Sequence, residues 1–157
     1  MATEIEKKFL IHPNKWSATP KPEGQWLVQG YLFEENYKSC RVRIAGDRAW
    51  INIKKMQDAL HRLEFEYEIP VPDATDLLNE LSISRIEKTR YNIPFKGHLW
   101  EVDVFAGANE GLIVAEIELK HADADFEKPD WVADEVTHDV RYLNTQLAQH
   151  PFSSWTT

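Results

Sequence analysis

Charged and apolar residues alternate in segment after segment of this chain. Near the N-terminus, Glu4, Glu6 and Lys8 occupy every second position. Ile5 and Phe9 are two of the residues between them. Successive side chains of an extended strand point to opposite faces of a sheet. The pattern therefore predicts a strand that has two carboxylates and an ammonium group on one face.

The same alternation recurs in seven later segments. In residues 38–46, for instance, Arg41 and Arg43 share one face. Gly and Asp within residues 45–48 predict a tight hairpin turn, and Gly97 predicts another. The eight predicted strands are residues 3–11, 25–34, 38–46, 49–55, 61–69, 84–94, 98–105 and 112–120.

Two other segments have helical periodicity. Residues 72–81 carry leucines at helical spacing, and residues 137–149 carry Leu143 and Leu147 on one side. We expect an α+β fold in which these helices pack against the outside of the sheet. No linker or low-complexity run divides the chain, so residues 1–157 are predicted to form a single domain.

The overall charge excludes some classes of partner. The chain has 18 basic and 26 acidic residues, a formal net charge of −8, which argues against non-specific binding to nucleic acid or to anionic membranes. Cys40 is its single cysteine, so an intrachain disulfide is excluded. The N-terminus lacks the layout of a signal peptide, and no apolar run approaches the roughly 20 residues of a membrane helix. The expectation is a soluble cytoplasmic protein.

Eight strands with one charged face each suggest a closed sheet. An ordinary sheet with its polar face in water is the alternative. Closing the sheet into a barrel would remove its edges, with the charged faces lining the interior and the apolar faces outside. Buried charges are costly unless they are paired or hold ligands and metal. Both signs of charge are present, so a tunnel for a metal–anion complex is physically reasonable.

Charged motifs follow one another in a set order along the chain. They are Glu4-x-Glu6-x-Lys8, Arg41-Val42-Arg43, Ile53-Lys54, Arg62-Leu63-Glu64-Phe65-Glu66, Glu87-Lys88-Thr89-Arg90, Trp100-Glu101-Val102-Asp103 and Ala115-Glu116-Ile117-Glu118. This combination resembles the CYTH superfamily of triphosphate tunnel metalloenzymes over almost the whole chain. The resemblance implies an eight-stranded antiparallel β-barrel that binds triphosphate and a divalent cation in a charged interior.

The resemblance also implies two sets of site residues. The basic set would bind the triphosphate and support its cleavage, and it comprises Lys8, Arg41, Arg43, Lys54, Lys88 and Arg90, with Arg62 as a further substrate-binding candidate. The acidic set would bind Mg²⁺ or Mn²⁺, with two ions expected during catalysis, and it comprises Glu4, Glu6, Glu64, Glu66, Asp103, Glu116 and Glu118.

The leading functional hypothesis is metal-dependent hydrolysis of inorganic triphosphate to pyrophosphate and phosphate. An adenylate cyclase of the fourth class, a thiamine triphosphatase, another nucleoside triphosphatase and a polyphosphate- or nucleotide-binding module are the alternatives, because fold alone does not choose among them. The apolar outer wall leaves a homodimer open. The start of the C-terminal helix is a candidate cover for one tunnel mouth, although packing on the outer wall is the simpler expectation.

Overall fold

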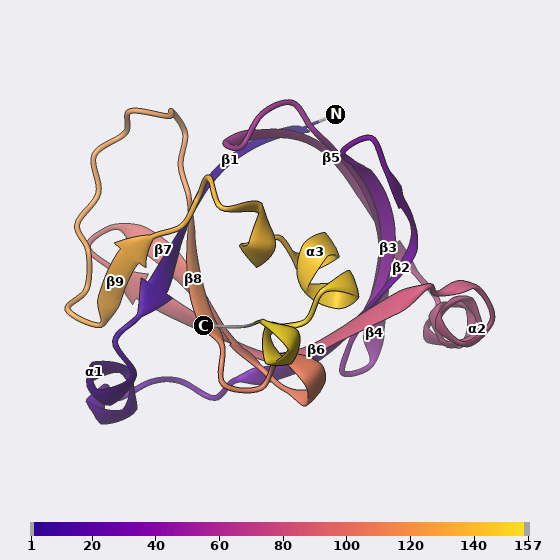
Figure 1. Ribbon diagram of the computed structural model, residues 1–157, viewed down its shortest axis with the longest axis horizontal. Helices are drawn as coiled ribbons and strands as arrows, with labels where there is room; N and C mark the ends of the chain where they lie inside the picture. Colours follow the sequence, from indigo (N-terminus) through magenta and orange to yellow (C-terminus); the bar gives the residue numbers. More distant parts are fainter. Residues whose placement is uncertain (1, 156–157) are drawn as a thin grey trace.

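A computed structural model describes the backbone of residues 2–155 and the side chains of residues 5–155. Eight antiparallel strands follow one another round the barrel in the order β5-β4-β3-β2-β6-β7-β8-β1, and β1 pairs with β5 to close it (Figure 1). The predicted eight-stranded barrel is therefore confirmed. The strands are β1 (Ala2–Ile11), β2 (Gln25–Glu35), β3 (Lys38–Ala45), β4 (Arg48–Met56), β5 (His61–Ile69), β6 (Ser84–Phe95), β7 (His98–Phe105) and β8 (Ile113–Glu118).

Tight turns join most neighbouring strands in the sequence. Gly46, with φ of 62°, connects β3 to β4, and Gly97, with φ of 82°, connects β6 to β7. Positive φ is available to glycine without a steric penalty, which explains why the turns fall at these residues. Both turns lie where the sequence predicted them.

Two elements were not predicted from the sequence. The short helix α1 (Pro13–Ala18) follows β1, and its proline stands in the first turn, where its missing N–H costs nothing. The short strand β9 (Val132–Glu135) pairs with the end of β1 outside the closed barrel. An element of four residues is too short to give a clear alternation, and β9 depends on pairing with a strand more than a hundred residues away.

The apolar outer face of the barrel is covered in two places. Helix α2 (Val71–Leu81) packs Ala74 and Leu78 against Val42 and Ala49. This helix lies outside the barrel, as predicted (Figure 1).

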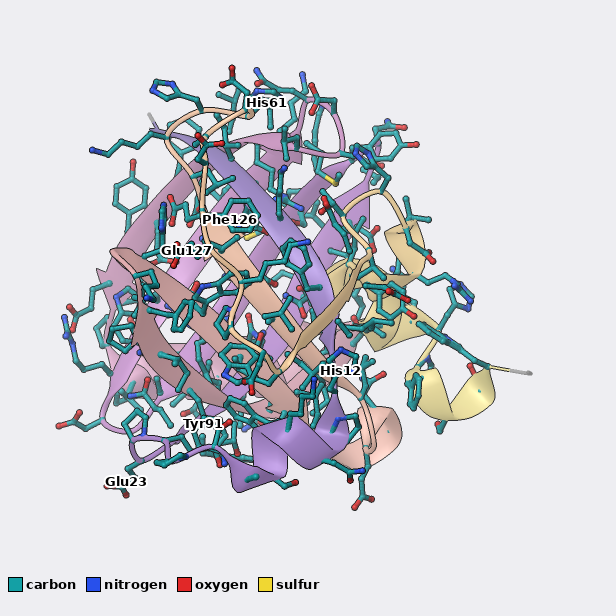
Figure 2. The ribbon with its side chains drawn as sticks, turned by 90° about the vertical axis from the view of Figure 1, so that its left-hand side faces the viewer. His12, Glu23, His61, Tyr91, Phe126 and Glu127 are labelled. Atoms are coloured by element: carbon teal, nitrogen blue, oxygen red, sulfur yellow. The ribbon has the colours of Figure 1, made fainter. Side chains whose placement is uncertain are left out.

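A second cover consists of α1 and residues 119–131, which lie over β1, β7 and β8. Trp16 and Trp131 pack there with Trp100, which is completely buried. Figure 2 faces this wall and labels Phe126 among its side chains. Large aromatic side chains bury much apolar area, so the outer cluster supplies a core outside the barrel.

The C-terminal segment packs across one end of the barrel. The predicted helix over residues 137–149 is divided into the 3₁₀ turn η2 (Val140–Tyr142) and the helix α3 (Asn144–Gln149). The 3₁₀ turns η1 (Gly107–Asn109) and η3 (Phe152–Ser154) lie beside them. Viewed down the barrel, α3 falls within the ring of strands (Figure 1).

An apolar layer explains this position. Tyr142 and Leu147 of the C-terminal segment pack with Tyr31, Phe105 and Val114 of the barrel. The expectation that the C-terminal helix packs on the outer wall is therefore corrected: it binds an apolar layer at the end of the barrel. Across the described part of the chain, no helix combines the length and apolarity needed to cross a bilayer.

Candidate functional site

A cavity of about 620 Å³ lies inside the barrel. All eight barrel strands contribute at least one side chain to its wall, and Val140 and Leu143 of the C-terminal segment border it. The charged residues that line it are Glu6, Lys8, Glu34, Lys38, Arg41, Arg43, Lys54, Arg62, Glu64, Glu66, Arg90, Glu101, Glu116 and Glu118. The charged faces predicted from the alternation thus turn inward.

The basic residues of β3 and the acidic residues of β8 lie on opposite walls. Three strands separate β3 from β8 in either direction round the barrel: β2, β6 and β7 one way, β4, β5 and β1 the other. Arg41 and Arg43 therefore face the cavity from one side, and Glu116 and Glu118 face it from the other. A ligand in the cavity would meet guanidinium groups on one wall and carboxylates on the opposite wall.

The two arginines of β3 have hydrogen-bonding capacity to spare. The Nε atoms of Arg41 and Arg43 are buried and lack a hydrogen-bond partner among the described residues. Burial and the positive charge of Arg41 lower the pKa of Arg43. It pairs with the carboxylate of Glu66, with Arg43 Nη2 to Glu66 Oε1 at 3.7 Å. Buried donors without partners are costly, so this wall is suited to an anion.

Lys8 links the acidic wall to the C-terminal segment. Its Nζ atom lies 3.6 Å from Glu116 Oε1 and donates a hydrogen bond to the carbonyl oxygen of Tyr142 at 3.3 Å. In the strand register Lys8 stands opposite Glu116, which places both side chains on the inner face. The lysine of the N-terminal motif is thus held between the acidic wall and the cover at the barrel end.

Glu6 and Arg62 form a close ion pair inside the barrel. Arg62 Nη1 lies 2.8 Å from Glu6 Oε1, and both side chains are largely buried. Arg62 was predicted to bind substrate, and it does line the cavity. Part of its charge is, however, already compensated by Glu6.

Glu64 and Glu66 are bridged by Asn52, which was not among the predicted site residues. The Nδ2 group of Asn52 donates to Glu64 at 2.8 Å and to Glu66 at 2.9 Å. Lys54 also lies 3.8 Å from Glu64. Asn52 shares the inward parity of Lys54 on β4, and that parity was the signal that could have identified it.

Lys88 and Asp103 have the inward parity of Arg90 but are not among the residues that line the cavity. Both are almost completely buried, and Lys88 Nζ donates to Asp103 Oδ2 at 2.7 Å. Arg90, which does line the cavity, donates to Asp103 at 2.7 and 2.9 Å and to Glu101 at 3.1 Å. Two predicted site residues therefore lie outside the cavity lining and contact it through Arg90. Glu101 lines the cavity and helps to hold Arg90.

The charges of this buried group are strongly coupled. Burial lowers the pKa of Lys88 to about 8, even though Asp103 opposes the shift. Burial would raise the pKa of Asp103, but Lys88 and Arg90 outweigh it and lower the pKa. Asp103 thus remains a carboxylate whose oxygens are engaged by two cations, which leaves it poorly suited to bind a metal ion.

Comparison with known proteins identifies the family. The model of the CYTH domain matches residues 2–151. The chain belongs to the CYTH family. The triphosphate tunnel enzymes of this family are metal-dependent.

Two curated relatives and one solved structure resemble this CYTH protein closely. An inorganic triphosphatase of Acetivibrio thermocellus is 45% identical over 156 residues, which cover 99% of each chain. An inorganic triphosphatase of Nitrosomonas europaea is 37% identical and covers 93% of this chain and 97% of its own. The crystal structure of the inorganic triphosphatase NE1496 superimposes with a TM-score of 0.66 at 36% identity, covering 94% of this chain and 95% of that one.

The acidic wall of this CYTH protein fits a hard divalent cation. Glu6, Glu116 and Glu118 offer carboxylate oxygens to one cavity, the donor type that Mg²⁺ and Mn²⁺ prefer. Within residues 5–155, no three acidic, histidine or cysteine side chains are already grouped closely enough to form a metal site. Glu4, the other predicted ligand of the N-terminal motif, lies outside the described side chains.

The electrostatics of the acidic wall also favour a cation. Burial and the negative charge of Glu116 raise the pKa of Glu6, and Lys8 and Arg62 only partly compensate. Burial would raise the pKa of Glu116 too, but Lys8 and other nearby cations outweigh it and lower the pKa. One carboxylate is therefore stable as an anion while its neighbour resists ionisation, so an added cation would relieve this strain.

Replacing Glu6 by Gln should stabilise the metal-free protein at neutral pH. The pKa of Glu6 is higher in the folded protein than in the unfolded chain. The stability that Glu6 contributes is therefore fully present at a pH below its unfolded-state pKa, and it is lost as the pH rises through its folded-state pKa. At pH 7 the ionised carboxylate is thus a net cost. We expect the melting temperature of Glu6→Gln in EDTA to rise by a few degrees, and the further rise on adding Mg²⁺ to shrink.

The exposed Glu80 on α2 gives a matched Glu→Gln control. Thermal unfolding of wild type, Glu6→Gln and Glu80→Gln, each with EDTA and with Mg²⁺, makes the comparison. A lower melting temperature for Glu6→Gln in EDTA would mean that the ion pair with Arg62 dominates and that the acidic wall carries no excess negative charge.

Proposed function

We propose that this CYTH protein is a metal-dependent inorganic triphosphatase that cleaves triphosphate into pyrophosphate and phosphate. The observation that carries the proposal is the division of one cavity inside the barrel into a basic wall on β3 and an acidic wall on β8. A linear chain of phosphates needs cationic donors along its length and a cation to bridge it to carboxylates. The function of both curated relatives supports the same substrate.

The basic residues would bind and orient the triphosphate. Arg41 and Arg43 offer planar guanidinium groups whose Nε atoms are unpaired within the described residues, and these match phosphate oxygens in geometry. Lys54 and Arg90 add positive charge from the neighbouring walls. These donors are already in place and would stabilise the charge that develops on the departing pyrophosphate. Such electrostatic stabilisation is the largest contribution that a protein makes to phosphoryl transfer.

The acidic residues would hold the metal. Glu6, Glu116 and Glu118, together with Glu4, are the proposed ligands for Mg²⁺ or Mn²⁺, and two ions during turnover remain our proposal. A bound divalent ion would neutralise phosphate charge and lower the pKa of a water molecule. Lys8, 3.6 Å from Glu116, lies where the metal ligands and the phosphate-binding residues meet.

Steady-state turnover tests the proposal. We expect phosphate release from triphosphate with Mg²⁺ or Mn²⁺, little release in EDTA, and a kcat/KM at least about tenfold higher for triphosphate than for ATP or thiamine triphosphate. The reason for the preference is that the cavity wall is charged along most of its length, so a phosphate chain matches it better than an organic ring does.

Each other outcome points to a different function. Equal rates with ATP and triphosphate would remove the preference for an inorganic substrate. A higher rate with thiamine triphosphate, or formation of cyclic AMP from ATP, would assign the corresponding alternative. Tight binding of triphosphate without phosphate release would identify a binding module.

A further inference from the structure

Arg43 is the middle residue of a row that crosses three strands. In the strand register it stands opposite Gln29 of β2 on one side and opposite Trp50 of β4 on the other. Side chains in such positions are direct neighbours on one face of a sheet. All three therefore point into the barrel. Neither Gln29 nor Trp50 belongs to the charged set that was predicted to form the site.

Trp50 supports the guanidinium group of Arg43. The Cζ atom of Arg43 lies 5.1 Å from the centre of the Trp50 ring, within the range of a cation–π contact. Arg48 lies at the same distance from the ring and is itself bound by Glu68 at 2.6 and 3.2 Å. The indole is thus contacted by two guanidinium groups, and one of them is paired with a carboxylate.

Gln29 is a buried polar side chain. Its exposure is 1%, and neither its Nε2 nor its Oε1 atom has a hydrogen-bond partner among the described residues. Its cross-strand neighbour Arg43 has a buried, unpaired Nε atom. An unsatisfied buried amide normally costs stability, so its retention beside an unsatisfied guanidinium group indicates a role in the bound state.

The surroundings of Arg90 differ from those of Arg43. Carboxylates of Asp103 and Glu101 already accept three hydrogen bonds from Arg90. Arg43 instead has an aromatic ring and an amide beside it, and its closest carboxylate is 3.7 Å away. An aromatic face orients a guanidinium group without occupying its N–H donors, because the contact uses the face of the cation.

We propose that Trp50 and Gln29 are positioning residues for Arg43, which hold its guanidinium group in place while leaving its N–H donors for a phosphate of the substrate. The inference rests on the proposed function, since it takes triphosphate as the ligand of Arg43. Trp50 supplies the supporting surface. Gln29 supplies an amide oxygen that accepts a hydrogen bond from Arg43 once the ligand draws the guanidinium group into its bound position.

Substitutions at Trp50 test the proposal by binding and by kinetics. Trp50→Leu should raise the Kd and KM for triphosphate about three- to tenfold with little change in kcat, and Trp50→Phe should restore most of the affinity. Gln29→Leu should weaken binding in the same direction. Trp26→Leu is the matched control, because Trp26 also lies on a barrel strand but is 49% exposed on the outer face.

A double-mutant cycle separates positioning from simple packing. In the Arg43→Ala background, Trp50→Leu should change the Kd for triphosphate by less than about twofold, since the residue it acts through is gone. Calorimetric titration of triphosphate in EDTA, where little hydrolysis is expected, measures the Kd for all four proteins. Full additivity of the two substitutions, or a wild-type Kd for Trp50→Leu, would overturn the proposal.

The same cycle distinguishes failure of the proposal from failure of the proposed function. If Arg43→Ala binds triphosphate as tightly as wild type, the basic wall does not bind this ligand and the function itself is wrong. If Arg43→Ala weakens binding but the Trp50 variants do not, only the positioning role is wrong. Should Trp50→Leu fail to fold, Trp50→Phe and Gln29→Leu with Arg43→Ala provide the same comparison.

Discussion

Glu116→Gln should lower the turnover of triphosphate by about 10²–10³-fold while the barrel remains folded. Glu116 faces the cavity with only 11% of its side chain exposed, and it is an anion stabilised by Lys8. An amide has almost the same shape but no charge, so the variant loses a metal-binding carboxylate with little loss of packing. Phosphate release at saturating triphosphate, measured over a range of Mg²⁺ concentrations, gives kcat and the apparent metal affinity.

A surface carboxylate provides the control for Glu116. Glu127 pairs with Lys96 at 3.8 Å and is 68% exposed, so Glu127→Gln should leave turnover unchanged. Partial recovery of Glu116→Gln at high Mg²⁺ would agree with a ligand role. Wild-type turnover in Glu116→Gln would show that the acidic wall of β8 is not part of the active site.

Asp103→Ala should destabilise the protein by about 3–5 kcal/mol. The substitution deprives Lys88, which has no exposed surface, of the carboxylate that pairs with it, and it removes two of the hydrogen bonds that orient Arg90. Chemical denaturation measures the free energy of unfolding, and Asp125→Ala, at an exposed position in the outer segment, is the control.

The stability of Asp103→Ala distinguishes a buried counter-ion from a metal ligand. A metal ligand can be removed from the apo protein without a large loss of stability, whereas a buried counter-ion cannot. The double variant Lys88→Met/Asp103→Leu should recover much of the stability that Asp103→Ala loses, because it removes both charges. Near-wild-type stability of Asp103→Ala with a weakened response to Mg²⁺ would instead support the ligand role predicted from the sequence.

The alternation of charged and apolar residues predicted the barrel and most of the cavity wall, because the sequence of a single strand shows which side chains share a face. Glu6 and Lys8 on β1, and Arg41 and Arg43 on β3, line the cavity as that parity requires. Family resemblance added the antiparallel arrangement and the expected ligand. These properties depend on residues close together in the sequence, so a single chain reveals them.

Properties that depend on neighbours across strands were not predicted. Asp103 has the inward parity of a cavity residue, but Arg90 stands opposite it in the register and, with Lys88, engages its oxygens. Phe105 and Val114 share inward parity with the charged residues and yet form the apolar layer that binds the C-terminal segment. Alternation tells which side chains point inward, but not how deep they lie or which partner they meet.

Closure by β1 makes the N-terminal strand of the barrel dependent on its last strand, β8. β1 pairs with β5 on one side and with β8 on the other, about sixty and more than one hundred residues later. Such distant contacts slow folding, because the chain entropy is lost before the contacts form. Until β8 leaves the ribosome, β1 lacks one of its two neighbours and the nascent sheet has open edges. Pairing of β1 with β8 completes the barrel around the charged cavity. Before this pairing, the open strand edges expose the growing chain to aggregation.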